Sequence, residues 1–166
     1  HLASRWVREE RSTRVHIGIT APLPPPPPFN NQDPATLAQE AERLGFDSYW
    51  QHEHIISPMV KVGRRHFFPQ GDVAGYADPL VALARASGAT QRIKLGTSVI
   101  LAPERNAITL AKEAATLDLM SGGRLLLGIG TGWLEQEARI MGGNFARRWH
   151  QTVETVLALK ELWTKL

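Results

Sequence analysis

Apolar residues recur along the chain in two alternating patterns. Short runs rich in β-branched and aromatic residues predict strands at 15–19, 46–50, 92–101 and 124–130. After each of these runs, apolar residues return at helical spacing, which predicts four amphipathic helices. The helical stripes consist of these residues: Leu37, Ala38, Ala41 and Leu44; Leu80, Leu83 and Ala84; Leu110, Ala111, Ala114 and Leu117; Val156, Leu159, Trp163 and Leu166. The chain is therefore expected to repeat a strand–helix unit four times.

Capping residues indicate where the predicted helices begin and end. Asp33 and Asp78 are each followed by proline, so a side-chain cap precedes a residue suited to the first helical turn. Asn106 can cap the third helix in the same way, and Gly45 is a natural stop for the first. The sequence SGG at 121–123 ends the third helix. These signals and the periodicity support the same set of helices.

Strict alternation of strand and helix favours right-handed crossovers and a parallel α/β sheet. The predicted strands are apolar on both faces, as buried parallel strands are. Two architectures fit: an open doubly wound sheet, or part of a (β/α)8 TIM barrel. A complete barrel needs about 250 residues, so four units in 166 residues correspond to about half of one.

Two segments near the start fall outside this pattern. Residues 1–14 are charged, show no stripe of either period, and are interpreted as an N-terminal extension of a domain at 15–166. The sequence PLPPPPPF at 22–29 contains five consecutive prolines, which force polyproline II and exclude a helix or an inner strand. A stiff spacer is favoured over a ligand for a proline-binding module, because no basic residue flanks the run.

Composition narrows the class of protein. The chain has 43% hydrophobic and 21% charged residues, which is typical of a globular domain. No apolar run approaches the roughly 20 residues of a membrane span, and no signal-peptide core is apparent. The absence of cysteine excludes a disulfide scaffold and fits a reducing compartment, so a cytoplasmic location is expected. A net charge of +3 with scattered basic residues gives no reason to expect nucleic-acid binding.

The sequence SGGRLLLGIGTGW at 121–133 places glycines at alternate positions at the end of a predicted strand. The dinucleotide fingerprint fails here, because the spacing is Gly128-x-Gly130-x-Gly132 and lies on the fourth strand, not the first. A Walker loop fails as well, because no Gly-Lys-Ser/Thr follows. Taken alone, the pattern indicates backbone crowding where a strand end meets something bulky.

Three segments together resemble the luciferase-like monooxygenase family, and most of all its branch of oxidoreductases that use the deazaflavin coenzyme F420. They are LGFDSYWQHEHI, DPLVALARASGATQRIKLGTSVILAPERNAITLAKEAATLDLMSGGRLLLGIGTGWLEQE and ETVLALKELW. The resemblance covers about residues 35–166 and implies a (β/α)8 barrel, of which this chain holds about four units and ends before strand 5. It also implies that the glycines form a floor beneath the flat deazaflavin ring.

The resemblance further implies a site at the carboxyl ends of strands 2, 3 and 4. Glu53 and His54 match the acidic residue and histidine that follow strand 2 in the family, and they are the expected catalytic residues. The GTSV sequence matches the strand 3 bulge, where Ser98-Val99 is the expected cis peptide. The implied cofactor-binding residues are Gly96, Thr97, Ser98, Val99, Gly130, Thr131 and Gly132.

Trp133 stands where some deazaflavin dehydrogenases carry a proton-donating glutamate, so that acid role does not transfer. Trp133 is instead expected to wall the substrate pocket. His54 could donate a hydrogen bond, stabilise charge or shuttle a proton. His52 and His54 also form an H-x-H pattern that holds metals in other barrels, but no third ligand has matching spacing, so no metal is expected.

The resemblance implies hydride transfer between F420 and a small organic substrate. An FMN-dependent monooxygenase of the same family is the alternative. A hypothesis of another class is a truncated, non-catalytic half-barrel that acts only by association, because open sheet edges expose unpaired backbone groups. We expect the full-length parent to be an enzyme and a homo-oligomer, this piece alone to have little activity, and the substrate not to be specified by these residues.

Overall fold

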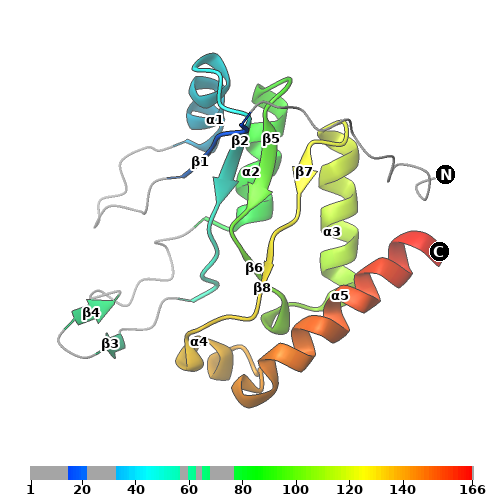
Figure 1. Cartoon of the computed structure of the whole chain (residues 1–166). Helices are drawn as coiled ribbons and strands as arrows, with labels where there is room; N and C mark the ends of the chain where they lie inside the picture. Colours follow the sequence, from blue (N-terminus) through cyan, green and yellow to red (C-terminus); the bar gives the residue numbers. More distant parts are fainter. Residues whose placement is uncertain (1–14, 22–32, 57–59, 63–64, 68–76, 166) are drawn as a thin grey trace.

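The computed structural model describes residues 15–21, 33–56, 60–62, 65–67 and 77–165. The predicted extension at 1–14 and the proline run at 22–29 lie outside these residues. Figure 1 shows the described part as a parallel sheet with helices packed beside it. No helix in this part is both long and apolar enough to cross a bilayer.

Four parallel strands form the main sheet, in the order β1-β2-β5-β7 (Figure 1). They are β1 (Gly18–Thr20), β2 (Ser48–Gln51), β5 (Lys94–Thr97) and β7 (Leu125–Leu126). In β2, Tyr49 pairs with Ile19 on one side and with Leu95 on the other. Each strand lies beside the next one formed after a helix, so the predicted parallel α/β arrangement is confirmed.

The four predicted helices are present, and their caps are those expected. They are α1 (Pro34–Arg43), α2 (Pro79–Ala89), α3 (Ala107–Met120) and α5 (Arg148–Lys165). Asp33, Asp78 and Asn106 each accept hydrogen bonds from backbone N–H groups of the first helical turn. The caps satisfy donors that a helix start otherwise leaves unpaired. The helices pack in sequence, α1 on α2, α2 on α3 and α3 on α5.

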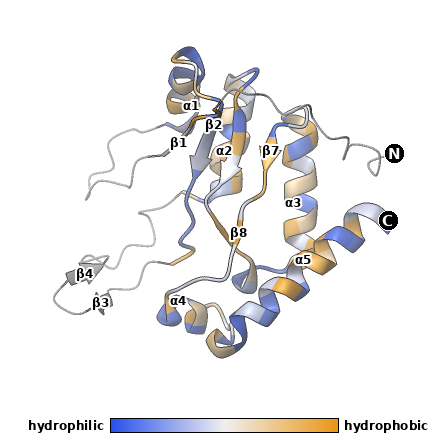
Figure 2. Ribbon diagram, viewed as in Figure 1, coloured by the Kyte–Doolittle hydropathy of each residue, from blue (hydrophilic) through white to orange (hydrophobic). Residues whose placement is uncertain are grey.

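The core lies between one face of the sheet and the helices. Tyr49 and Leu95 of the sheet are buried with Leu83 of α2, Leu110 of α3 and Leu159 of α5. Figure 2 shows hydrophobic residues along β7 and on α5 beside α3. The side chains next to Tyr49 in sequence point to the opposite face of the sheet, since neighbours alternate along a strand. This second face is the one that carries the indole ring of Trp50.

Two predicted strands are interrupted. The segment predicted as one strand at 92–101 forms β5 and then β6 (Ile100–Leu101), on either side of the cis peptide between Ser98 and Val99. The segment at 124–130 likewise forms β7 and then β8 (Ile129–Gly130), and β6 and β8 pair in a separate parallel sheet. The Ser98 N–H donates to the Gln51 carbonyl and the Ile100 N–H to the Gly128 carbonyl. The hydrogen-bonding partners therefore change between β5 and β6: β5 pairs with β2 and β7, whereas β6 pairs with β8.

Several short elements were not expected from the pattern. They are the hairpin of β3 (Val60–Val62) and β4 (Arg65–Phe67), the helix α4 (Glu135–Ile140), and the 3-10 turns η2 (Ala102–Glu104) and η3 (Phe145–Arg147). Each is too short to show a periodic stripe. The expectation that the strands are buried on both faces is wrong for the two outer strands of the sheet: all residues of β1 are exposed, and Leu126 of β7 is exposed as well.

Candidate active site

A pocket of about 190 Å³ lies where β2, β6 and β8 end. The carboxyl ends of parallel strands are where barrel enzymes bind their ligands. The pocket is lined by His52, Glu53, His54, Ser98, Val99, Leu101, Trp133 and Glu137. Five of the residues implied by the sequence therefore surround one cavity: Glu53, His54, Ser98, Val99 and Trp133.

His54 is held by a buried carboxylate from α4. Its Nδ1 lies 2.7 Å from Oε2 of Glu137, whose side chain is only 1% exposed. The other carboxylate oxygen of Glu137 accepts the Ile56 N–H at 3.1 Å. The Trp133 ring meets the His54 ring edge to face, with centroids 5.9 Å apart. The histidine ring is therefore fixed in orientation by a carboxylate on one nitrogen and an aromatic ring beside it.

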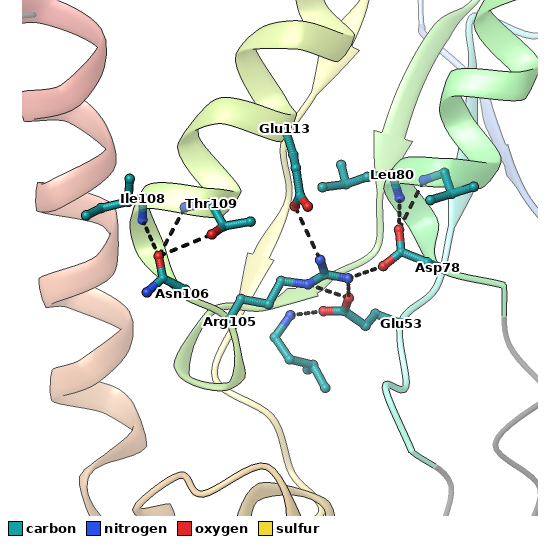
Figure 3. A network of polar contacts seen from close by, with 10 residues as sticks. Glu53, Asp78, Leu80, Arg105, Asn106, Ile108, Thr109 and Glu113 are labelled. Carbon is teal, nitrogen blue, oxygen red and sulfur yellow. Dashed lines mark hydrogen bonds and ion pairs between the residues drawn. The ribbon is translucent and has the colours of Figure 1, made fainter.

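Glu53 lines the pocket, but both of its carboxylate oxygens accept hydrogen bonds from neighbouring residues (Figure 3). One oxygen accepts the Leu101 N–H, and the other accepts two N–H groups of the Arg105 guanidinium. Arg105 also binds Asp78, the cap of α2. Burial raises the pKa of Glu53, although the hydrogen bonds from Arg105 and Leu101 act in the opposite direction. The catalytic role assigned to Glu53 remains a prediction, while its contacts join β2, β6 and α2.

The peptide between Ser98 and Val99 is cis, as the resemblance implies. The His52 ring lies between two backbone carbonyl groups. Its Nδ1 is 3.2 Å from the Ser98 oxygen, and its Nε2 is 3.2 Å from the Ala21 oxygen. His52 and His54 thus serve different partners. Within the described ranges, no group of three or more potential metal ligands is assembled.

Gly96 and the three alternating glycines at 128, 130 and 132 each have a close neighbour from another segment. A Cβ atom at Gly96 would overlap the Trp50 ring, one at Gly128 the Thr97 carbonyl, and one at Gly130 the Val99 side chain. Gly132 has a φ of +73° and lies against Glu104. This geometry supports backbone crowding as the reason for the glycines.

Five of the implied cofactor-binding residues lie outside the pocket lining: Gly96, Thr97, Gly130, Thr131 and Gly132. Thr97 is fully buried, and its hydroxyl bonds the backbone N–H and carbonyl of Gly128. The Thr131 hydroxyl is directed to the Gly132 carbonyl at 3.4 Å. Contact of these residues with a cofactor therefore remains a prediction.

The sequence did not single out Glu137, Leu101 or Glu104. Glu137 lies four residues after Trp133 in a short helix, and its partner His54 is 83 positions away in sequence. Glu104 is the last residue of η2, directly before Arg105, and it is buried. The resembling segment ends at Glu137, but neither its spacing nor its residue type marks this glutamate as the partner of His54.

A strand-end pocket on a parallel α/β sheet is the arrangement of a (β/α) barrel segment, and the comparisons with known proteins identify its family. The sequence model of the luciferase-like monooxygenase family matches residues 14–165. An uncharacterized protein of Mycobacterium tuberculosis is 38% identical over 138 residues, 80% of this chain and 49% of that protein. The F420-dependent glucose-6-phosphate dehydrogenase of Amycolatopsis mediterranei is 30% identical, over 82% of this chain and 39% of that enzyme.

Solved structures agree with the fold. An F420-dependent secondary alcohol dehydrogenase, in complex with an F420–acetone adduct, is 26% identical with a TM-score of 0.67, covering 90% of this chain and 42% of that one. The oxygenating constituent of 3,6-diketocamphane monooxygenase from Pseudomonas putida, in complex with FMN, shares the fold at 22% identity and a TM-score of 0.73, over 91% and 40%.

The chain belongs to the luciferase-like monooxygenase family. The predicted fold class is confirmed, since the structural neighbours are luciferase-like barrels of which this chain covers only part. It spans about half the length, or less, of the curated relatives it matches. Members of this family are oxidoreductases and monooxygenases that act on small molecules, some with F420 and others with FMN.

Proposed function

We propose that the pocket beside His54 receives the flat ring of F420, and that the whole protein transfers hydride between F420 and a small organic substrate. The observation that carries the proposal is the buried Glu137–His54 pair next to Trp133 at the strand ends. A histidine fixed by a carboxylate is suited to hold or move one proton at a defined place.

The pocket lining fits a planar heterocycle with polar edges. Val99, Leu101 and Trp133 supply apolar surface, and His54 supplies a hydrogen-bonding group beside it. Ligand pockets typically combine mostly apolar walls with a few fixed polar groups. F420, when bound, supplies or accepts the hydride at carbon 5 of its ring. The chain's own residues would orient that ring, exclude water and manage the accompanying proton.

The proton is the task that the structure suits best. Because Glu137 accepts from Nδ1, the proton of the neutral imidazole is held on that nitrogen. Oxidation of an alcohol to a carbonyl releases a proton from the hydroxyl group together with the hydride. His54 would take up this proton, and Glu137 would stabilise the imidazolium that forms. In the reverse reaction His54 would return the proton.

A relative named as F420-dependent, 30% identical across most of this chain, supports the choice of F420 in this proposal. The FMN-bound neighbour is 22% identical and supports the fold alone, while a relative named as a limonene monooxygenase is 33% identical over 64% of this chain. An FMN-dependent monooxygenase remains the second candidate, because the family contains such enzymes. Both candidates use the same pocket, so one titration separates them.

The test is a fluorescence titration of this chain with F420 and, separately, with FMN. A deazaflavin without the phosphate arm is added as a third ligand, since it probes only the ring pocket. We expect saturable binding of both deazaflavins, weakened about tenfold in His54→Ala through loss of a hydrogen bond to the ring. Glu135→Gln, an exposed glutamate on α4, is the matched control and should bind as the parent does.

Two results would contradict the proposal. Binding of FMN without binding of either deazaflavin would favour the monooxygenase. Binding of none of the three, together with concentration-dependent self-association, would favour the non-catalytic half-barrel.

A further inference from the structure

Glu104 lies next to the pocket lining. Its carboxyl group forms no ion pair among the described residues, whereas those of Glu53 and Glu137 do. It ends the turn η2, three residues after Leu101 of the pocket lining. Its side chain is 9% exposed, and one of its carboxyl oxygens is buried with no hydrogen-bond partner among the described residues. Its other oxygen would be 3.2 Å from a Cβ atom at Gly132. Glu104 therefore packs directly under the turn that leads to Trp133.

Among the described residues, Glu104 forms no ion pair, although the Nε of Arg148 on α5 is also buried without a hydrogen-bond partner. The charged groups on neighbouring elements include Glu53 after β2, Asp78 before α2, Arg105 after η2, Glu113 on α3, Glu137 on α4 and Arg148 on α5. Arg105 pairs with Glu53, Asp78 and Glu113 (Figure 3), and Arg148 donates to the Phe145 carbonyl. His54 pairs with Glu137. Ionised Glu104 would add a third buried negative charge beside Glu53 and Glu137.

We propose that Glu104 is a positioning residue of the pocket, and that its neutral acid form holds the turn at Gly132 and, through it, Trp133 and the start of α4. The positioning of the turn stands on the geometry, and only its effect on cofactor affinity rests on the proposed function. Neutral Glu104 packs against Gly132 without repelling Glu137. Ionised Glu104 would be driven toward water and away from its close approach to the Gly132 turn.

The pKa of Glu104 sets the pH at which Glu104 ionises and its packing against the Gly132 turn is lost. Burial, followed by the charges of Glu137 and Glu53, raises the pKa of Glu104 from 4.5 to about 8. Because the folded-state pKa is the higher one, the stabilising contribution is complete below about 4.5 and is lost as the pH rises through about 8. The pocket should therefore keep its geometry at neutral pH and lose it in mild alkali.

The experiment follows Trp133 in the chain without cofactor. The protein is labelled with 5-fluorotryptophan, the Trp133 signal is assigned with Trp133→Phe, and its ¹⁹F shift is recorded across a pH series. We expect a transition centred at about 8 in the parent and in the control Glu135→Gln. The transition should disappear in Glu104→Gln, which keeps the shape of the side chain but does not ionise. A flat parent titration, or an unchanged transition in Glu104→Gln, would overturn the proposal.

Two further measurements complete the test. In carboxyl ¹³C spectra of the glutamate-labelled protein, a carboxyl carbon that titrates at about 8 in the parent and is missing in Glu104→Gln supports the proposal, and none titrating above about 6 in the parent overturns it. Affinity for the arm-less deazaflavin should be about tenfold lower at about pH 9 than at about pH 7, and constant in Glu104→Gln. If no deazaflavin binds at any pH while Trp133 still titrates, the F420 assignment fails and the role of Glu104 is supported.

Discussion

The structural role of Glu53 predicts an asymmetric response when its partner Arg105 is changed. Arg105→Met keeps the length of the side chain but removes the guanidinium, which leaves the Glu53 carboxylate buried with only the Leu101 N–H as a donor. Breaking a buried ion pair from one side typically costs about 3–5 kcal/mol, because the remaining charge is uncompensated. Arg105 also loses its bond to Asp78, which is about 40% exposed and adds less than about 1 kcal/mol.

Removing Glu53 instead should cost less. In Glu53→Gln the amide oxygen still accepts a hydrogen bond, no buried charge is left alone, and Arg105 keeps Asp78 and Glu113 as partners. We expect a loss of about 1–2 kcal/mol, the value of a charge-assisted hydrogen bond. The double variant Arg105→Met/Glu53→Gln should then be more stable than Arg105→Met alone, since no carboxylate remains to be desolvated.

The assay is urea unfolding at neutral pH, followed by far-UV circular dichroism, with the free energy of unfolding compared at equal slope. Glu113→Gln is the matched control, because Glu113 is exposed and 3.6 Å from Arg105, and it should change stability by less than about 0.5 kcal/mol. Equal losses for Arg105→Met and Glu53→Gln, with no recovery in the double variant, would refute the reasoning that Glu53 is held as a buried charge.

Three other changes test the fold around the site. Arg124 is buried and donates to four backbone carbonyls and the Thr90 hydroxyl, so Arg124→Met should destabilise the chain by about 3–5 kcal/mol in the same assay; an effect below about 1 kcal/mol would contradict this. Burial acts to raise the pKa of Glu42, but N–H donors of Ile93, Arg92 and Gln91 together lower it, so its stabilisation is present above the unfolded-state pKa and lost as the pH falls through the folded value. Glu42→Gln should accordingly cost about 1 kcal/mol at neutral pH and nothing in strong acid, and a pH-independent cost would show that the charge is not involved. Gly130→Ala should destabilise by about 1–3 kcal/mol through overlap with Val99, whereas Gly88→Ala in α2 meets nothing and should be neutral or stabilising by thermal unfolding.

Helices were predictable from the sequence because their signals are local. The Asp33, Asp78 and Asn106 caps lie within three residues of the N–H groups they bind, and the apolar stripes repeat within one helix. The parallel arrangement followed from the alternation alone. The interruptions of the two strands, at 98–99 and at 127–128, could not be located by periodicity, because the apolar runs at 92–101 and 124–130 continue through them.

The site was predictable only where a residue matched a family motif. His54 and Trp133 were placed at the pocket by resemblance, and they do line it. Glu137 was not, because a glutamate in a short polar helix has the same appearance whether it faces water or a histidine 83 positions away. For Glu53, the sequence showed an acidic residue at a strand end but did not indicate that Arg105 pairs with its carboxylate.

The central claim is that one flat ring binds between His54, Val99 and Trp133, and saturation transfer measures this directly. The ring protons of bound deazaflavin are irradiated while the methyl signals of Val99 and Leu101 and the indole signal of Trp133 are observed. The account predicts that these signals lose intensity first and that the exposed Trp149 on α5 does not change. Transfer to Trp149 with none to Val99 or Trp133 would contradict it.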